Sequence, residues 1–488
     1  MDEYSFQTST KPDTQNSTQV SAVNRPTNDD AEVWRRYWIA QGQSWRTEPE
    51  IKEDRQKFLA QRRSIFPNIK QAIYPFKDIK LSRADVEWLL ATHDNGRGPV
   101  DWSDAGQRER QGLDLRGALL NKENLSGLPM ASIQGGLTGK EYFYASPEEC
   151  KMAAVQMEGV LLIGTSLEGA KLNEANLKGA NLYRTHLESA EFQVASLEKA
   201  YLNEAYLGGA NFKSSRLEGA FLSKAHLEGR STPSADLRRA FLDATTNLNN
   251  IIISSKEHGA IIVADVCWNG ANLSVVNWSQ LKMLGDEHIA RQRMRDGRVK
   301  DKITRLKEYE AATRANRQLS VALQGQGMNE IAARFAYRAN VLQRKVLWYR
   351  LIAEHEPEQA QKPWHRLVQQ WFIEGLRSIR KFGSLIFSLF LDALAGYGFR
   401  PGRALGWYLL VVLGYAAAYF QLEHLAKLHL SFLGALIFSV TAFHGRGFFP
   451  GGFGYDDPVT ILAASEAVIG LLIELSFIAT FTQRFFGK

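Results

Sequence analysis

The sequence lacks most of the features that accompany catalysis or a cross-linked fold. Its 488 residues include only two cysteines, Cys150 and Cys267, too few for a disulfide framework, and no Cys/His cluster has zinc-site spacing. It has no G-x-S-x-G, P-loop or HExxH motif, and its histidines are scattered. We therefore expect a non-enzymatic protein of a reducing compartment, without catalytic residues, metal or cofactor.

The first residues also lack the charged start and apolar stretch of a signal peptide, so we expect the N-terminal part to stay in the cytosol. Residues 1–31 are polar and predict a disordered tail. The net charge of +7 selects neither nucleic acid nor an anionic membrane as partner. At roughly 150 residues per domain, the length predicts about three units. Long apolar runs are nearly absent before residue 380 and concentrated after it.

Residues 32–112 carry apolar side chains at spacings of three and four, which predicts short amphipathic helices that cap the next domain of the chain. Ser82 is placed as the N-cap of one of them.

A strict five-residue period begins after this cap. From residue 157 to residue 227 every fifth residue is apolar, which makes fifteen centres, twelve of them Leu. Two residues before each centre stands a small or β-branched residue. An α-helix repeats every 3.6 residues and a strand every two, so this period requires a coil in which both positions point inward.

The run resembles the pentapeptide repeats, whose pattern A-(D/N)-L-x-x is present in Ala175-Asn176-Leu177 and Ala180-Asn181-Leu182. The resemblance implies a right-handed quadrilateral β-helix with about 20 residues per coil. We assign it to residues 113–285, with an insert at 131–152 that is expected to be helical.

The surface of this solenoid suggests no chemistry. Some pentapeptide-repeat proteins mimic DNA through an acidic surface, but residues 155–244 carry 11 acidic and 10 basic side chains. A 20-residue coil places Tyr201, Phe221 and Phe241 on one face, either as a docking surface for a protein partner or as cover for hydrophobic neighbours. Glu168, Glu188 and Glu228 share another face, which we interpret as a solvated wall.

Residues 286–362 predict a helical hairpin that faintly resembles a tetratricopeptide-like repeat. Its basic and acidic residues are mixed, so we expect no nucleic-acid partner. Residues 363–403 predict juxtamembrane amphipathic helices.

The C-terminal residues 404–488 predict a membrane domain. Residues 404–420 and 459–481 are long enough to cross the hydrocarbon layer, whereas the apolar run 430–443 is too short. We therefore predict a re-entrant pore helix at 430–443. Basic residues flank both crossings on the same side, which places both termini in the cytosol and the chain in the cytoplasmic membrane.

This plan resembles the two-transmembrane potassium-channel-like pore domain. The resemblance implies a homotetramer that conducts an inorganic ion along its central axis and whose outer surface contacts membrane lipid. Alignment from Ser439 through Thr441 and His444 places the filter signature on Gly445, Arg446, Gly447, Phe448, Phe449 and Pro450. Only Gly447 and the aromatic Phe448 match, and Phe449 replaces a glycine. A second register, Gly452-Phe453-Gly454, lies five residues further along, and neither predicts potassium selectivity. Arg446 either faces the pore and favours anions or turns outward to a carboxylate.

Glu466, Gly470 and Glu474 share one face of the second crossing. An ionisable residue within a membrane span indicates function by default. Glu474 either forms a cation-attracting ring or pairs with another subunit or Arg446. For Glu466 we expect a packing hydrogen bond behind the filter loop, and for Gly470 a hinge of the gate.

The fold class is therefore mixed multidomain: a pentapeptide-repeat β-helix with a helical cap and helical linker, followed by an α-helical transmembrane pore domain. The predicted function is a tetrameric ion channel with a rigid cytosolic platform. The alternative is a non-conducting membrane-anchored scaffold whose solenoid binds a protein partner.

Overall fold

The computed structural model describes residues 25–229, 233–255, 259–292, 299–353, 382–426, 431–445 and 457–485. The chain divides into two compact units, Met1–Ala190 and Glu191–Lys488, and each is described by itself below. Most of the predicted tail, residues 1–24, lies outside the described residues.

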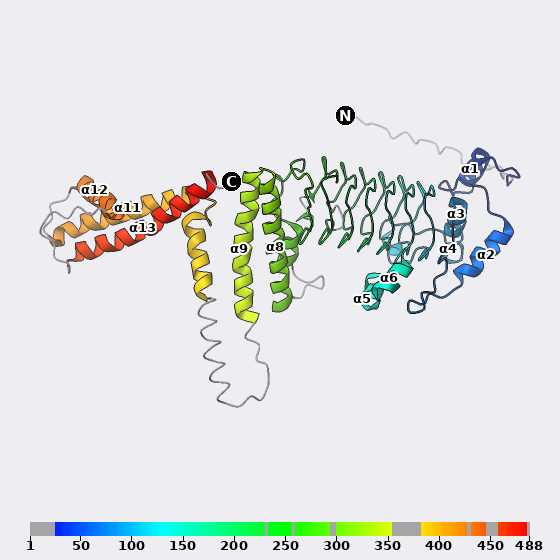
Figure 1. The fold of residues 1–488 in the computed structure, drawn as a ribbon, viewed down its shortest axis with the longest axis horizontal. Helices are drawn as coiled ribbons and strands as arrows, with labels where there is room; N and C mark the ends of the chain where they lie inside the picture. Colours follow the sequence, from blue (N-terminus) through cyan, green and yellow to red (C-terminus); the bar gives the residue numbers. More distant parts are fainter. Residues whose placement is uncertain are drawn as a thin grey trace, which may run out of the picture. The chain divides into compact units, whose positions relative to one another are not determined.

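The first unit begins with short helices, seen in blue in Figure 1. They are α1 (Ala31–Ala40), α2 (Glu53–Arg63), α3 (Arg83–Ala91), α4 (His93–Gly96) and the 3-10 helix Ala105–Gln107. Ser82 caps α3 as predicted, and its hydroxyl accepts a hydrogen bond from the backbone N–H of Asp85. Arg83 donates to the backbone carbonyls of Asn124 and Ser126, which docks α3 on the first solenoid coil.

The solenoid of the first unit consists of stacked coils joined by isolated parallel bridges rather than by long strands. One column of bridges runs from Asp114 to Gln134 and on to Lys171. Leu177 and Ala175 are fully buried, as are the equivalent side chains of the neighbouring repeats. The predicted inward orientation of both positions is therefore confirmed.

The predicted helical insert interrupts the second coil between Gln134 and Gln156. It contains α5 (Gly139–Tyr144) and α6 (Pro147–Ala153), each begun by a capping box, at Thr138 and Ser146. Asn173 donates to the carbonyl oxygen of Leu137, so the coil itself holds the root of the insert.

The solenoid continues in the second unit with the same inward Leu and Ala side chains. Phe192 and Phe212 replace Leu at two centres and stack inside the core, with ring centroids 5.0 Å apart. A two-residue hairpin of β1 (Ser254–Ser255) and β2 (Gly259–Ala260) precedes the last coil.

Three helices cover the end of the last coil. They are α7 (Gly285–Arg291), α8 (Lys302–Gly325) and α9 (Asn329–Ala353), and the antiparallel α8 and α9 form the predicted hairpin (Figure 1). The side-chain amide of Gln326 donates to the carbonyl of Ala271 and accepts from the N–H of Leu273. It thereby makes the hydrogen bonds that the backbone of a further coil would make. Trp278 is buried against Phe335 of α9.

The C-terminal helices are the segment Phe382–Ala395, α11 (Pro401–Ala426), α12 (Phe432–Phe443) and α13 (Pro458–Phe485). The short apolar stretch 430–443 forms a helix, α12, which begins after the N-cap Ser431. Of the predicted juxtamembrane helices at 363–403, residues 363–381 lie outside the described residues. The described helix Phe382–Ala395 ends in a turn where Gly396, Tyr397 and Gly398 have positive φ.

Asp286 closes the solenoid end through its carboxylate. Its side chain is buried and accepts hydrogen bonds from the N–H groups of Val263 and Ala264, at 2.8 and 3.1 Å. Burial raises the pKa of Asp286 from its ordinary value to about 6, against the opposing effect of these two donors.

We predict that Asp286→Asn removes a pH dependence from the stability of this end. The folded carboxyl holds its proton more tightly than the unfolded one, so its contribution is greatest below pH 4. The contribution of this carboxyl group to the free energy of unfolding falls by at most roughly 3 kcal/mol as the pH rises through about 6. Hydrogen exchange of the Val263 and Ala264 amides across this range measures it, and an equal slope in the Asn variant would contradict it.

Candidate functional site

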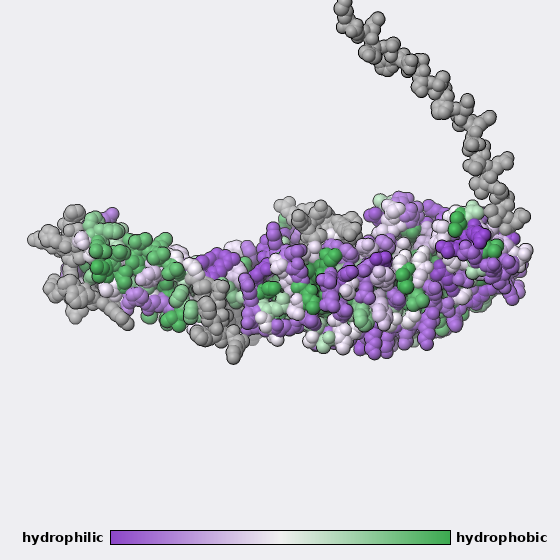
Figure 2. All heavy atoms as spheres, turned by 90° about the horizontal axis from the view of Figure 1, so that it is seen from above, coloured by the Kyte–Doolittle hydropathy of each residue, from purple (hydrophilic) through white to green (hydrophobic). Residues whose placement is uncertain are grey.

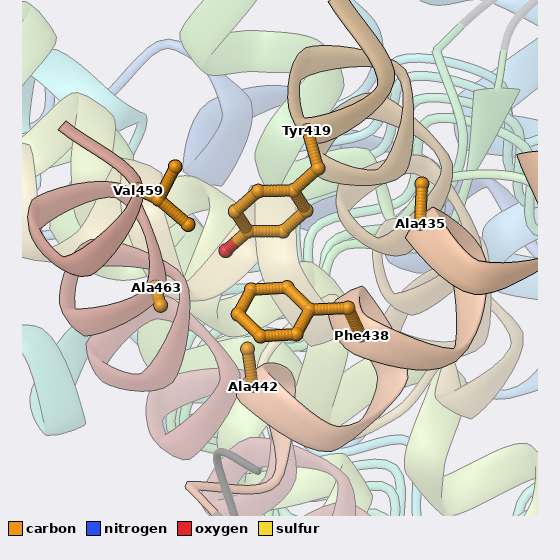
Figure 3. Close-up of a cluster of buried hydrophobic side chains, with 6 residues drawn as sticks. All are labelled: Tyr419, Ala435, Phe438, Ala442, Val459 and Ala463. Carbon is orange, nitrogen blue, oxygen red and sulfur yellow. The ribbon is translucent and has the colours of Figure 1, made fainter. Parts of the chain in front are cut away.

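The helices α11, α12 and α13 pack as a bundle with α12 in contact with both others. Figure 3 shows its core. Phe438 of α12 meets Tyr419 of α11 edge-to-face, with centroids 4.8 Å apart. The small side chains of Ala435, Ala442 and Ala463 let the three helices approach closely.

The C-terminal end of α12 rests on Gly470 of α13. A Cβ atom added to Gly470 would lie 2.0 Å from the carbonyl oxygen of Phe443, so no side chain fits there. This contact gives the glycine a packing role that the sequence analysis did not consider. Its predicted role as a gate hinge stays a prediction.

A buried polar network joins all three helices at Glu466. The side chain is fully buried on α13 and accepts hydrogen bonds from the Tyr419 hydroxyl of α11, at 2.7 Å, and the Ser439 hydroxyl of α12, at 2.5 Å. The Ser439 hydroxyl also lies 2.9 Å from the carbonyl oxygen of Val412. These donors replace the water that a carboxyl group loses in an apolar bundle.

A second polar pair lies at the end of α12. Nδ1 of His444 is in contact with a carboxylate oxygen of Glu474, and both side chains are partly exposed, at 41% and 36%. The sequence analysis offered Arg446 as the partner of Glu474 and missed His444. The only signal for it was a histidine 30 residues before Glu474. The contact itself depends on the seating of α12 at Gly470.

The remaining predicted filter residues divide into two groups. Thr441 donates to the carbonyl of Phe438 within its own helix, and Gly445 follows His444 with a positive φ of 66°. Arg446, Gly447, Phe448 and Phe449 lie outside the described residues.

The outer faces of α11 and α13 are apolar and uncovered. Two spans, Gly402–Leu422 and Pro458–Ala479, are long and apolar enough to cross a membrane, and only 22% of each is buried. Figure 2 shows this green surface over the bundle. Such a low buried share is unlike the core helix of a soluble protein.

On the solenoid, Tyr201 and Phe221 stack in parallel with centroids 4.9 Å apart, and Tyr201 is 44% exposed. The prediction that Phe241 continues this face is wrong. Phe221 pairs with Asn247, while Phe241 pairs with Arg216 in the neighbouring column. Between residues 156 and 226 bridge partners are 20 residues apart, but they are 25 apart from Asn211 to Asp236 and from Arg216 to Phe241, which shifts the register by one side.

Glu168, His186 and Glu188 bring potential metal-ligand atoms within 4.8 Å of one another. One carboxylate oxygen of Glu168 and one of Glu188 are buried and have no hydrogen-bond partner among the residues that the structure describes. Burial raises the pKa of Glu168. The same buried oxygen recurs at Glu198, Glu218 and Glu228. We therefore attribute it to the coil corner and assign no metal.

Comparison with known proteins supports the solenoid. Residues 150–188 and 190–229 match the family model of pentapeptide repeats, in eight copies. The chain therefore contains a pentapeptide-repeat β-helix, as predicted. No curated protein matches the chain.

Several solved structures are similar over part of the chain. Rfr23, a pentapeptide repeat protein from the cyanobacterium Cyanothece 51142, is 23% identical, with 33% of this chain and 92% of that one covered and a TM-score of 0.19. HetL, a pentapeptide repeat protein from the cyanobacterium Nostoc sp. strain PCC 7120 involved in heterocyst differentiation regulation, is 20% identical. The match covers 38% and 79% of the two chains, with a TM-score of 0.15.

We predict that Gly470→Ala destabilises the bundle by about 1–3 kcal/mol. The new methyl group would overlap the carbonyl oxygen of Phe443, so the end of α12 would have to shift to relieve the overlap. Thermal unfolding of the detergent-solubilised protein measures the effect. Gly414→Ala on α11 is the matched control, since nothing lies within 4 Å of its added Cβ. Equal midpoints for the two variants would contradict the packing role.

We also predict that Tyr419→Phe and Ser439→Ala are coupled through Glu466. Each single variant leaves the Glu466 carboxyl group one of its two hydroxyl donors, whereas the double variant removes both. The loss of stability in the double variant should exceed the sum of the singles by about 0.5–2 kcal/mol. Tyr415→Phe is the control, because its hydroxyl bonds Ser465 at the surface. Simple additivity would argue against the network.

Proposed function

We propose that the chain is a subunit of a tetrameric ion channel in the cytoplasmic membrane, with the pentapeptide-repeat solenoid on the cytosolic side. The observation that carries the proposal is the placement of α12. Its 12 residues span about 18 Å, too little for a hydrocarbon core of about 30 Å. A short apolar helix held between two membrane-length helices is the arrangement of a re-entrant pore helix.

The uncovered faces of α11 and α13 support assembly. One bundle of three helices encloses no conduit of its own, and its apolar outer side chains need lipid or further subunits around them. In the proposed ring of four, we expect the partly exposed pair of Glu474 and His444 to lie beside the conduit. There it supplies negative charge that attracts cations.

Asp392 supports a mechanical link from the cytosolic part to the pore. Its carboxylate accepts from the Tyr337 hydroxyl and pairs with Arg344, both on α9, at 3.1 and 2.8 Å. It also pairs with Arg403 at the start of α11, at 3.3 Å. Movement of the hairpin is thereby transmitted to the first membrane helix.

A scaffold remains the second candidate, and one observation favours it. The exposed Tyr201 and the Phe221 ring stacked on it present an aromatic surface that suits a protein partner. In that case the membrane helices only anchor and assemble the solenoid.

The channel is tested by planar-bilayer recording of the purified full chain in asymmetric KCl. We predict a cation-side reversal potential that Glu474→Gln moves toward zero, because four carboxylates lose their charge. Glu158→Gln, an exposed acid on the solenoid, should leave it unchanged. Intact protein that passes no current, or a reversal potential indifferent to Glu474, would contradict the proposal.

A further inference from the structure

A cavity of about 840 Å³ lies in the second unit, where the end of the solenoid, α8, α9 and the turn before α11 meet. Its size lies within the range of small-molecule sites. Six basic side chains line it: Lys282, Arg291, Arg334, Arg338, Arg344 and Arg400. Among the described residues, only two acidic side chains, Glu287 and Glu330, line it with them.

Three of these arginines are paired with acids. Glu287 is buried and pairs with Arg291 and Arg338, each at 2.5 Å. Arg344 pairs with Asp392 at 2.8 Å. Their guanidinium groups are therefore fixed in place as part of the wall.

Lys282, Arg334 and Arg400 have no acidic partner in the part of the chain that the structure describes. Arg334 donates to the backbone carbonyl of Leu281, at 3.0 Å, which orients its guanidinium and leaves further N–H donors. Arg400 lies over the ring of Tyr337, 4.6 Å from the centroid. A guanidinium stacked in this way presents its donors at its edges. Three cations thus face one remaining acid, Glu330.

We propose that this cavity binds a phosphate-bearing anion with more than one negative charge. Two oriented arginines offer the planar forks that match phosphate oxygens bidentately, and the lysine adds a point charge. The same chemistry is supplied by a soluble phosphorylated molecule or by the headgroup of an anionic phospholipid.

The site would also regulate the proposed channel, and this part of the inference rests on that function. Arg334 belongs to α9, whereas Arg400 directly precedes α11. An anion bound by both ties the hairpin to the first membrane helix, in addition to the bonds made by Asp392.

Binding is tested by calorimetric titration of pyrophosphate into the full chain, held in nanodiscs of phosphatidylcholine. We expect saturable binding that weakens with salt and that Arg334→Gln/Arg400→Gln weakens about tenfold or more. Arg317→Gln is the control, since Arg317 is exposed on α8 outside the cavity. Binding that survives in the double variant would overturn the proposal.

A lipid arm distinguishes the two sources. If pyrophosphate does not bind, the thermal midpoint is compared between phosphatidylcholine nanodiscs and nanodiscs that contain phosphatidylglycerol. Stabilisation by phosphatidylglycerol that the double variant loses and Arg317→Gln keeps identifies a headgroup site. Absence of both pyrophosphate binding and this difference would overturn the proposal.

Bilayer currents with and without pyrophosphate, or with and without phosphatidylglycerol, then separate the site from the channel. Binding without any current sustains the site and contradicts the channel. Current together with binding, but without a change on adding the anion, overturns the regulatory role alone.

Discussion

The structure depends on one packing constraint. Each five-residue repeat of the coil buries side chains from two positions, and the apolar interior and backbone groups at the two ends of the stack must be covered. Every interior coil of a unit is covered by its neighbours, but an end coil must be covered by something else. At the end of the solenoid, in the second unit, Asp286 and Gln326 bond the otherwise open backbone groups of the last coil, and Trp278 packs against the hairpin of α8 and α9. The cover of the solenoid is thus also the structure from which the chain continues toward its apolar helices.

The same bonds that satisfy exposed groups also connect successive parts of the second unit. Arg314 of α8 pairs with Asp265 of the last coil, at 3.0 Å, and Asp392 joins α9 to the start of α11. Within the bundle, Glu466 holds three helices through two hydroxyl groups. Carboxyl groups recur at these junctions because one carboxyl group accepts bonds from several segments at once.

The sequence predicts the solenoid well, because the period of five leaves few geometries and both inward positions, such as Ala175 and Leu177, are visible in it. It also predicts α12 and the two long apolar helices from length and composition. The position of Phe241 was not predicted, because a fixed coil of 20 residues was assumed, whereas Phe241 pairs with Arg216, 25 residues earlier. The pair of His444 and Glu474 and the basic cavity depend on how separate helices meet, which is a matter of packing rather than pattern.

The central claim is that the apolar bundle forms a pore with other copies of the same chain. The most direct measurement is the stoichiometry of the full chain in lipid nanodiscs, by native mass spectrometry. The account predicts four copies, held by the uncovered faces of α11 and α13. A chain that stays monomeric in lipid would contradict it, because three helices of one copy enclose no conduit.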